Sequence, residues 1–166
     1  MDVLKNQLAE SHKDLHQWFL FHQECLLLGE DILAMQAYDA FMSYLQKHIQ
    51  FENQYLLNDM RLNDGRWPLE VYRKEHDKLD AMLVRLSQML VDYQRLQGRR
   101  KRLALLELLD YEQTLRHVME HHEEREEMDL FSHVMKVNAD WQTTNLQLQM
   151  RYADLKNLLK AKLEEG

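Results

Sequence analysis

Residues 68–90, PLEVYRKEHDKLDAMLVRLSQML, decide the fold class of this chain. Apolar residues recur here at intervals of three and four, which puts them on one face of an α-helix. Pro68 suits the first turn of a helix, where its missing N–H costs nothing. The stretch therefore predicts a helix from Pro68 to Leu96, whose inward face carries Leu69, Tyr72, His76, Leu79, Leu83, Leu86 and Leu90.

The composition supports a helical domain. The chain has 166 residues, long enough for one domain with a real core, but only four glycines and one proline. A β-rich fold needs more turn residues than this. The net charge of −7 argues against binding nucleic acid, and the single cysteine, Cys25, excludes a disulfide framework. Without an apolar signal segment or a membrane span, a cytoplasmic location is expected.

Four breaks separate the helical stretches: LLGED at 27–31, NDGRWP at 63–68, QGRR at 97–100 and VNAD at 137–140. The basic run GRRKR at 98–102 is expected to be a solvated connection. Short connections between long helices predict an all-α, up-down-up-down four-helix bundle over residues 1–137. Residues 138–166 are expected to form an additional amphipathic helix, packed on the same domain or on a partner. The four bundle helices are expected at 3–28, 32–58, 68–96 and 102–136.

Each of the four helices has a histidine on its apolar face. Two of these faces carry a carboxylate one turn after the histidine, at Glu52 and Glu126. Burying such groups together without a cation would add several unfavourable desolvation terms. Imidazole and carboxylate together suit iron, manganese or zinc, and facing helices of a bundle are a common place for a dinuclear site. The pattern predicts a metal site that uses His12, His48, Glu52, His76, His122 and Glu126.

The heights of these residues along the helices refine the prediction. His12 lies about as far before the first turn as His48 lies after it, so the two should meet at one level. His22 lies nearer the turn and should occupy an end layer. His16 is off the main apolar face. His117 and His121 form a second pair four residues apart, ranked lower because their face is polar.

Four motifs in order resemble the hemerythrin-like, or HHE cation-binding, domains over residues 8–135. They are HKDLHQWF at 12–19, HIQFENQYLL at 48–57, EHDKL at 75–79 and HHEEREEMDLF at 121–131. The resemblance implies two non-haem iron ions, with manganese or a mixed pair as an alternative. The implied ligands are His12, His48, Glu52, His76, His122 and either Glu126 or Glu127, with Glu52 and the carboxylate of the last helix bridging the ions.

The sequence departs from the oxygen-carrying members of this family at Tyr72, where they have a histidine. Its hydroxyl is expected to hydrogen-bond a bridging ligand. One iron would then lack a protein ligand and hold water or recruit His16 or His117, and His121 is a further substitute.

The function implied by the resemblance is binding of dioxygen, a related small diatomic or peroxide, for storage, delivery or sensing. A di-iron oxidase or peroxidase-like enzyme, with Tyr72 as a proton donor, is an alternative. A third reading is an iron-responsive module whose C-terminal helix meets a protein partner or a second copy of the chain. A metal- or oxygen-binding protein is preferred over an enzyme.

Overall fold

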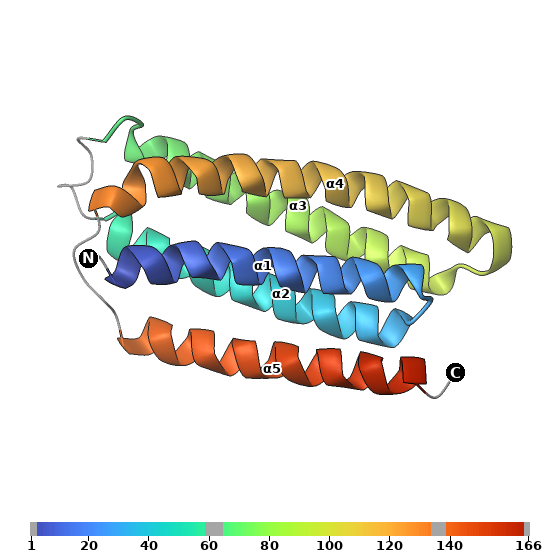
Figure 1. Cartoon of the computed structure of the whole chain (residues 1–166). Helices are drawn as coiled ribbons and strands as arrows, with labels where there is room; N and C mark the ends of the chain where they lie inside the picture. The colour runs from blue at the N-terminus through green and yellow to red at the C-terminus, as the bar shows by residue number, and fades with distance from the viewer. Residues whose placement is uncertain (1–2, 59–64, 134–138, 165–166) are drawn as a thin grey trace. The chain divides into compact units, whose positions relative to one another are not determined.

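The structure, a computed structural model, describes residues 3–58, 65–133 and 139–164. Every regular element in these ranges is helical, so the predicted all-α class is confirmed (Figure 1). One compact unit contains α1, α2 and α5, and another contains η1, α3, α4 and η3. The elements are α1 (Val3–Leu27), α2 (Asp31–Phe51), η1 (Glu52–Leu56), α3 (Leu69–Arg95), α4 (Gly98–Met128), η3 (Leu130–His133) and α5 (Ala139–Glu164).

A glycine turn joins α1 to α2. Gly29 has a φ of 72°, a conformation that costs glycine no Cβ clash. Its N–H donates to the Leu26 carbonyl at 3.1 Å, and the Glu30 N–H donates to the Cys25 carbonyl at 2.9 Å. This pair of bonds is the Schellman ending of a helix, and it satisfies carbonyls that the last turn leaves open. The turn therefore fixes the register between α1 and α2.

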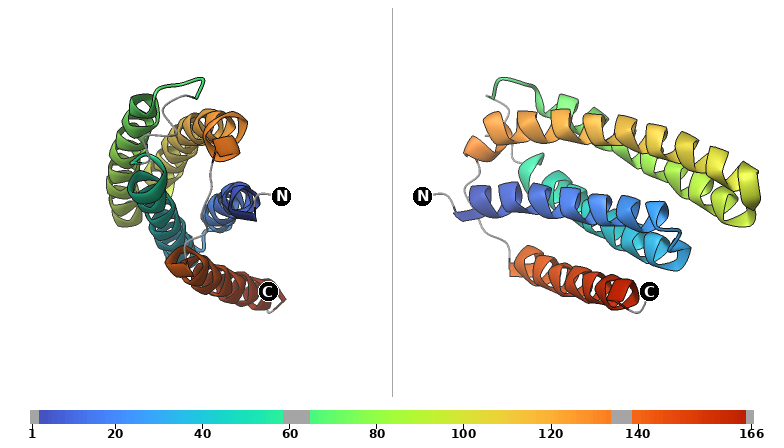
Figure 2. Two further views of the ribbon diagram at one scale, coloured as in Figure 1. Left: turned by 90° about the vertical axis from the view of Figure 1, so that its left-hand side faces the viewer. Right: turned by 45° about the vertical axis from the view of Figure 1, so that its right-hand side comes forward.

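The C-terminal helix α5 packs on α1 and α2, and the three helices lie side by side (Figure 2). The ring of Tyr152 stacks on Trp18 with 4.9 Å between centroids, and its hydroxyl donates to the Gln17 carbonyl at 3.4 Å. Leu155 and Leu159 are buried on the same helix. The predicted C-terminal helix is therefore present, and its buried residues face α1 and α2.

In the second unit, α3 and α4 form a long hairpin. The whole predicted inward face of α3 is buried, from Leu69 to Leu90, and Tyr93 extends it by one turn. On α4 the buried apolar residues are Leu108, Leu115 and Met119. Burial of these side chains removes apolar surface from water, which stabilises the hairpin.

Three predicted helix ends, on α2 and α4, need correction. The basic run is not a connection, because α4 begins at Gly98 and residues 99–102 form its first turns. Gly98 has a φ of 56° and lets the chain reverse over two residues, while Lys101 stands over the Tyr93 ring at 4.8 Å. The second α-helix stops at Phe51, and α4 stops at Met128 before the 3-10 turn η3. Residues 59–64 and 134–138, which include parts of two predicted breaks, lie outside the described ranges.

Among the described residues, no helix combines the length and the apolar character that crossing a membrane requires.

Candidate metal centre

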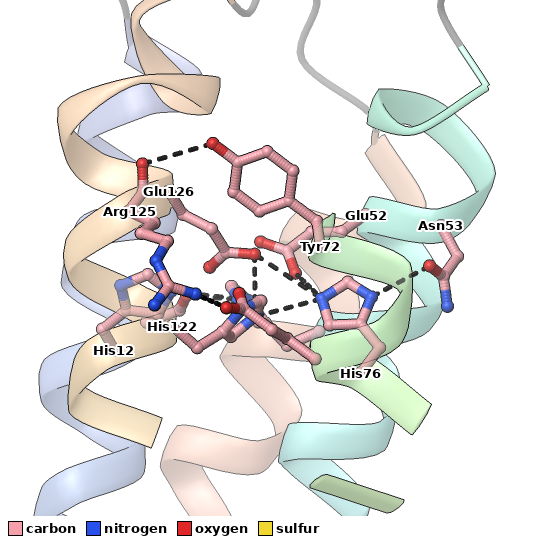
Figure 3. A network of polar contacts seen from close by, with 11 residues as sticks. His12, Glu52, Asn53, Tyr72, His76, His122, Arg125 and Glu126 are labelled. Carbon is pink, nitrogen blue, oxygen red and sulfur yellow. Dashed lines mark hydrogen bonds and ion pairs between the residues drawn. The ribbon is translucent and has the colours of Figure 1, made fainter. Parts of the chain in front are cut away.

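Two consecutive residues of η1 contact the same histidine of α3. α2 passes directly into η1, a single π-helical turn in which the Leu57 N–H donates to the Glu52 carbonyl at 2.8 Å. A π turn inserts a residue into the helical register, and such turns are frequent at functional sites. The Glu52 carboxylate lies 3.3 Å from His76 Nε2, and Asn53 Oδ1 lies 2.9 Å from His76 Nδ1 (Figure 3). Side chains of η1 thus contact both ring nitrogens of one imidazole.

α4 supplies the other half of this buried group. His122 and Glu126 lie one helical turn apart and face the same way. His122 Nε2 is 2.9 Å from Glu126 Oε1 and 3.1 Å from His76 Nε2. Ligand atoms of Glu52, His76, His122 and Glu126 all lie within 4.8 Å of one another, and all four side chains are buried. Two imidazoles and two carboxylates are donors that iron, manganese and zinc accept.

The two histidines are held in the same tautomer by neighbours outside the group. The amide oxygen of Asn53 can only accept, so His76 donates from Nδ1. His122 likewise donates from Nδ1 to Glu75 Oε2 at 2.9 Å, and Glu75 forms an ion pair with Arg125. Each neutral ring therefore keeps its Nε2 lone pair, as a metal ligand must.

A second pair of histidines lies in the unit formed by α1, α2 and α5. His12 Nε2 is 3.1 Å from His48 Nε2, and both side chains are buried. The Ser11 hydroxyl donates to the Leu8 carbonyl at 2.6 Å, so its oxygen accepts from His48 Nδ1 at 3.0 Å. His48 thus also keeps its lone pair on Nε2. The two imidazoles meet at one level, as their equal spacing from the α1–α2 turn predicts.

The buried group of η1, α3 and α4 fits a cation electrostatically. Two Nε2 lone pairs that face each other at 3.1 Å repel unless a proton or a metal ion lies between them. Burial alone lowers the pKa of His76, but hydrogen bonds to Glu126 and Glu52 outweigh it and raise the pKa above its ordinary value. Burial also lowers the pKa of His122, and the charge of Glu126 reverses the effect. The group favours positive charge at its centre, so its residues fit a divalent metal ion.

The family model of the hemerythrin HHE cation-binding domain matches residues 4–134. The chain belongs to this family. No curated protein and no solved structure matches the chain. The family and the buried donors together identify the hemerythrin domain as a cation-binding domain.

The predicted site residues that were ranked lower, or left as alternatives, differ in their burial. Glu126 lies within the group of η1, α3 and α4, whereas Glu127 is exposed. His117 and His121 are exposed on α4 and contact carboxylates of their own helix. His16 is half-buried on α1. His22 is a core residue whose Nδ1 donates to the Ala34 carbonyl at 2.7 Å.

The neighbours that orient the buried histidines were not predicted. Only Glu75 gave a signal, as the residue before His76 in the EHDKL motif, yet it contacts His122 on the opposite helix. Asn53 lies inside the HIQFENQYLL motif and Ser11 directly precedes HKDLHQWF, but neither position is one that the motif predicts to contact a histidine. Glu123 is also buried on α4, where its side chain is 8% exposed.

The Tyr72 hydroxyl is not directed at a bridging ligand, and this expectation is corrected. It donates to Asp129 Oδ2 at 3.0 Å, beyond the end of α4. Burial and this hydrogen bond raise the pKa of Tyr72 well above its ordinary range. The same carboxylate accepts from the backbone N–H groups of Arg66 at 2.9 Å and Trp67 at 3.3 Å. Tyr72 therefore links α3 to the end of α4, which removes the support for it as a proton donor to peroxide.

Proposed function

We propose that this hemerythrin domain binds two iron ions and uses them to bind dioxygen or a related small diatomic, for storage, delivery or sensing. The observation that carries the proposal is the buried group of Glu52, His76, His122 and Glu126. Its imidazoles are fixed with Nε2 turned inward by Asn53 and Glu75. Such preorganised neighbours set ligand orientation and basicity in metal proteins.

The proposed ligand set follows the family. Glu52 and Glu126 would bridge the ions, His76 and His122 would bind one of them, and His12 and His48 would bind the other. The chain itself supports including His48. It lies in the last turn of α2, four residues before Glu52, and η1 follows α2 without an intervening residue. His12 is included in the proposed ligand set because its Nε2 lies 3.1 Å from His48 Nε2.

Each ion would receive two imidazoles in this assignment. Tyr72 stands where oxygen-carrying members have a further histidine, and its hydroxyl is engaged by Asp129. When bound, the iron pair would supply an open coordination position for a small ligand. The site would have fewer imidazoles than the oxygen-carrying members of the family, which favours sensing or storage over reversible carriage.

The protein side of the site orients the donors and excludes water. Leu79 and Met119 are buried about one turn from His76 and His122, toward the middle of the hairpin. Apolar neighbours lower the local dielectric and keep competing water away from a bound metal. Arg125 balances the charge of Glu75, so the His122 Nδ1 proton stays on the ring.

The test is a spectrum of the iron-loaded, reduced protein under nitrogen and after admission of air. We expect a charge-transfer band to appear with oxygen and to disappear on deoxygenation. The same measurement on His76→Ala is the control, since it removes an imidazole from the buried group. A fully loaded protein whose spectrum does not respond to oxygen would contradict diatomic binding, while leaving iron binding intact.

A further inference from the structure

The exposed face of α4 carries a second set of metal-binding side chains. Residues 117–124 read HVMEHHEE, which places His117, Glu120, His121 and Glu124 at intervals of three, one and three. These four share one helical face, because residues three and four apart are neighbours on a helix. Their side chains are between 43% and 73% exposed. The buried ligands His122 and Glu126 of the same helix are at most 4% exposed, so they belong to its other face.

Each of these exposed histidines has a carboxylate beside its Nδ1. His117 Nδ1 lies 3.3 Å from Glu120 Oε2, and His121 Nδ1 lies 3.7 Å from Glu124 Oε2. Arg116 also approaches Glu120, at 3.7 Å. A carboxylate at Nδ1 stabilises the tautomer with its lone pair on Nε2, the arrangement of ligating histidines. Both Nε2 atoms are therefore available on the solvent side of the helix.

We propose that His117 and His121 form an exposed site on α4 for one divalent transition-metal ion of borderline softness, such as Zn²⁺. Two histidines four residues apart on a helix can bind one zinc ion together, and imidazole suits zinc, copper and nickel. Glu120 and Glu124 add negative charge, and either can rotate to become a further ligand. Water would complete the coordination, so the ion exchanges freely with solution. This site is separate from the proposed iron centre and does not depend on it.

An exposed charged helix face ordinarily serves solubility alone. Carboxylates would be enough for that purpose, and lysine or arginine would pair with them at any pH in the physiological range. Here each carboxylate lies beside a histidine, and the two histidines are four residues apart, a spacing that lets two imidazoles share an ion. The proposal rests on this spacing, which is also what the experiment changes.

The experiment adds Zn²⁺ to the iron-loaded protein in equilibrium dialysis and measures both metals in the protein. We expect one equivalent of zinc to bind with no loss of iron. His117→Ala and His121→Ala should each weaken zinc binding by at least about tenfold, because each removes one of two protein ligands. Helicity and iron content should stay unchanged, since both side chains face solvent.

A spacing control separates this site from nonspecific binding to histidine. Gln113 is exposed one turn before His117. Combining Gln113→His with His117→Ala keeps two exposed histidines on α4 but places them about 12 Å apart along the helix. This variant should bind zinc as weakly as His117→Ala alone. Zinc binding at the wild-type level in the control, or no zinc equivalent in the wild-type protein, would overturn the proposal.

Discussion

Replacing His76 with alanine should lower the metal content of the protein and reduce its free energy of unfolding by about 3 to 5 kcal/mol. His76 lies within 3.5 Å of both buried carboxylates, Glu52 and Glu126, and of the imidazole of His122. Removing it takes away one metal ligand and leaves two buried carboxylates with less compensating charge. Metal analysis of the purified variant and urea unfolding with and without metal measure the two effects.

His22→Ala is the matched control for this variant. His22 is also fully buried, but its Nδ1 bonds the Ala34 carbonyl and its ring lies among Phe19 and Tyr38. We expect it to lose about 1 to 2 kcal/mol of stability while retaining the wild-type amount of metal. Full metal content in His76→Ala would show that the buried group is not the binding site. If His22→Ala folds like the wild-type protein but loses metal, the assay does not separate metal ligands from core histidines.

Replacing Asp129 with alanine should destabilise the protein by about 3 kcal/mol without changing its metal content. Asp129 is 8% exposed and accepts hydrogen bonds from the N–H groups of Arg66 and Trp67 and from the Tyr72 hydroxyl. Truncation leaves the two N–H groups without this acceptor and leaves the Tyr72 hydroxyl with its longer contact to the Arg125 carbonyl, at 3.5 Å. Asp129 packs closely against Gly65, because a Cβ at that glycine would lie 2.6 Å from Asp129 Oδ2. Denaturant unfolding and metal analysis provide the measurement.

Asp92→Ala is the control for Asp129. Its side chain is 60% exposed on α3 and approaches Arg95 at 3.8 Å. Such a surface ion pair contributes little, so we expect a change below about 0.5 kcal/mol. Equal stability losses in the two variants would mean that Asp129 does not hold the loop and the two helices together.

The helices were predictable because burial follows periodicity within a single element. All seven residues of the predicted inward face of α3 are buried. The π turn at Glu52 was not predictable, because it differs from an α-helix only in which carbonyl accepts the Leu57 N–H. The basic run was misassigned for a related reason. An exposed helical turn tolerates charge as readily as a loop does, and only Gly98 marks the reversal.

The inward-facing histidines and carboxylates could likewise be predicted from periodicity. The residues that hydrogen-bond the buried histidines could not. Glu75 is adjacent to His76 in sequence but bonds His122, and Tyr72 bonds Asp129 fifty-seven positions away. Such contacts depend on the register between two helices, which no pattern within one helix specifies. The family motifs suggested that Tyr72 stands at a ligand position, but they carry no information on where a phenol in place of an imidazole directs its hydroxyl.

The number of iron ions per chain tests the central claim most directly. The metal-free protein is loaded with Fe²⁺ under nitrogen, passed through a desalting column, and analysed for iron and protein together. The proposed ligand set predicts two iron ions per chain in the wild-type protein, and fewer than two retained in His76→Ala. A fully folded wild-type protein that retains one iron ion or none would contradict a dinuclear centre.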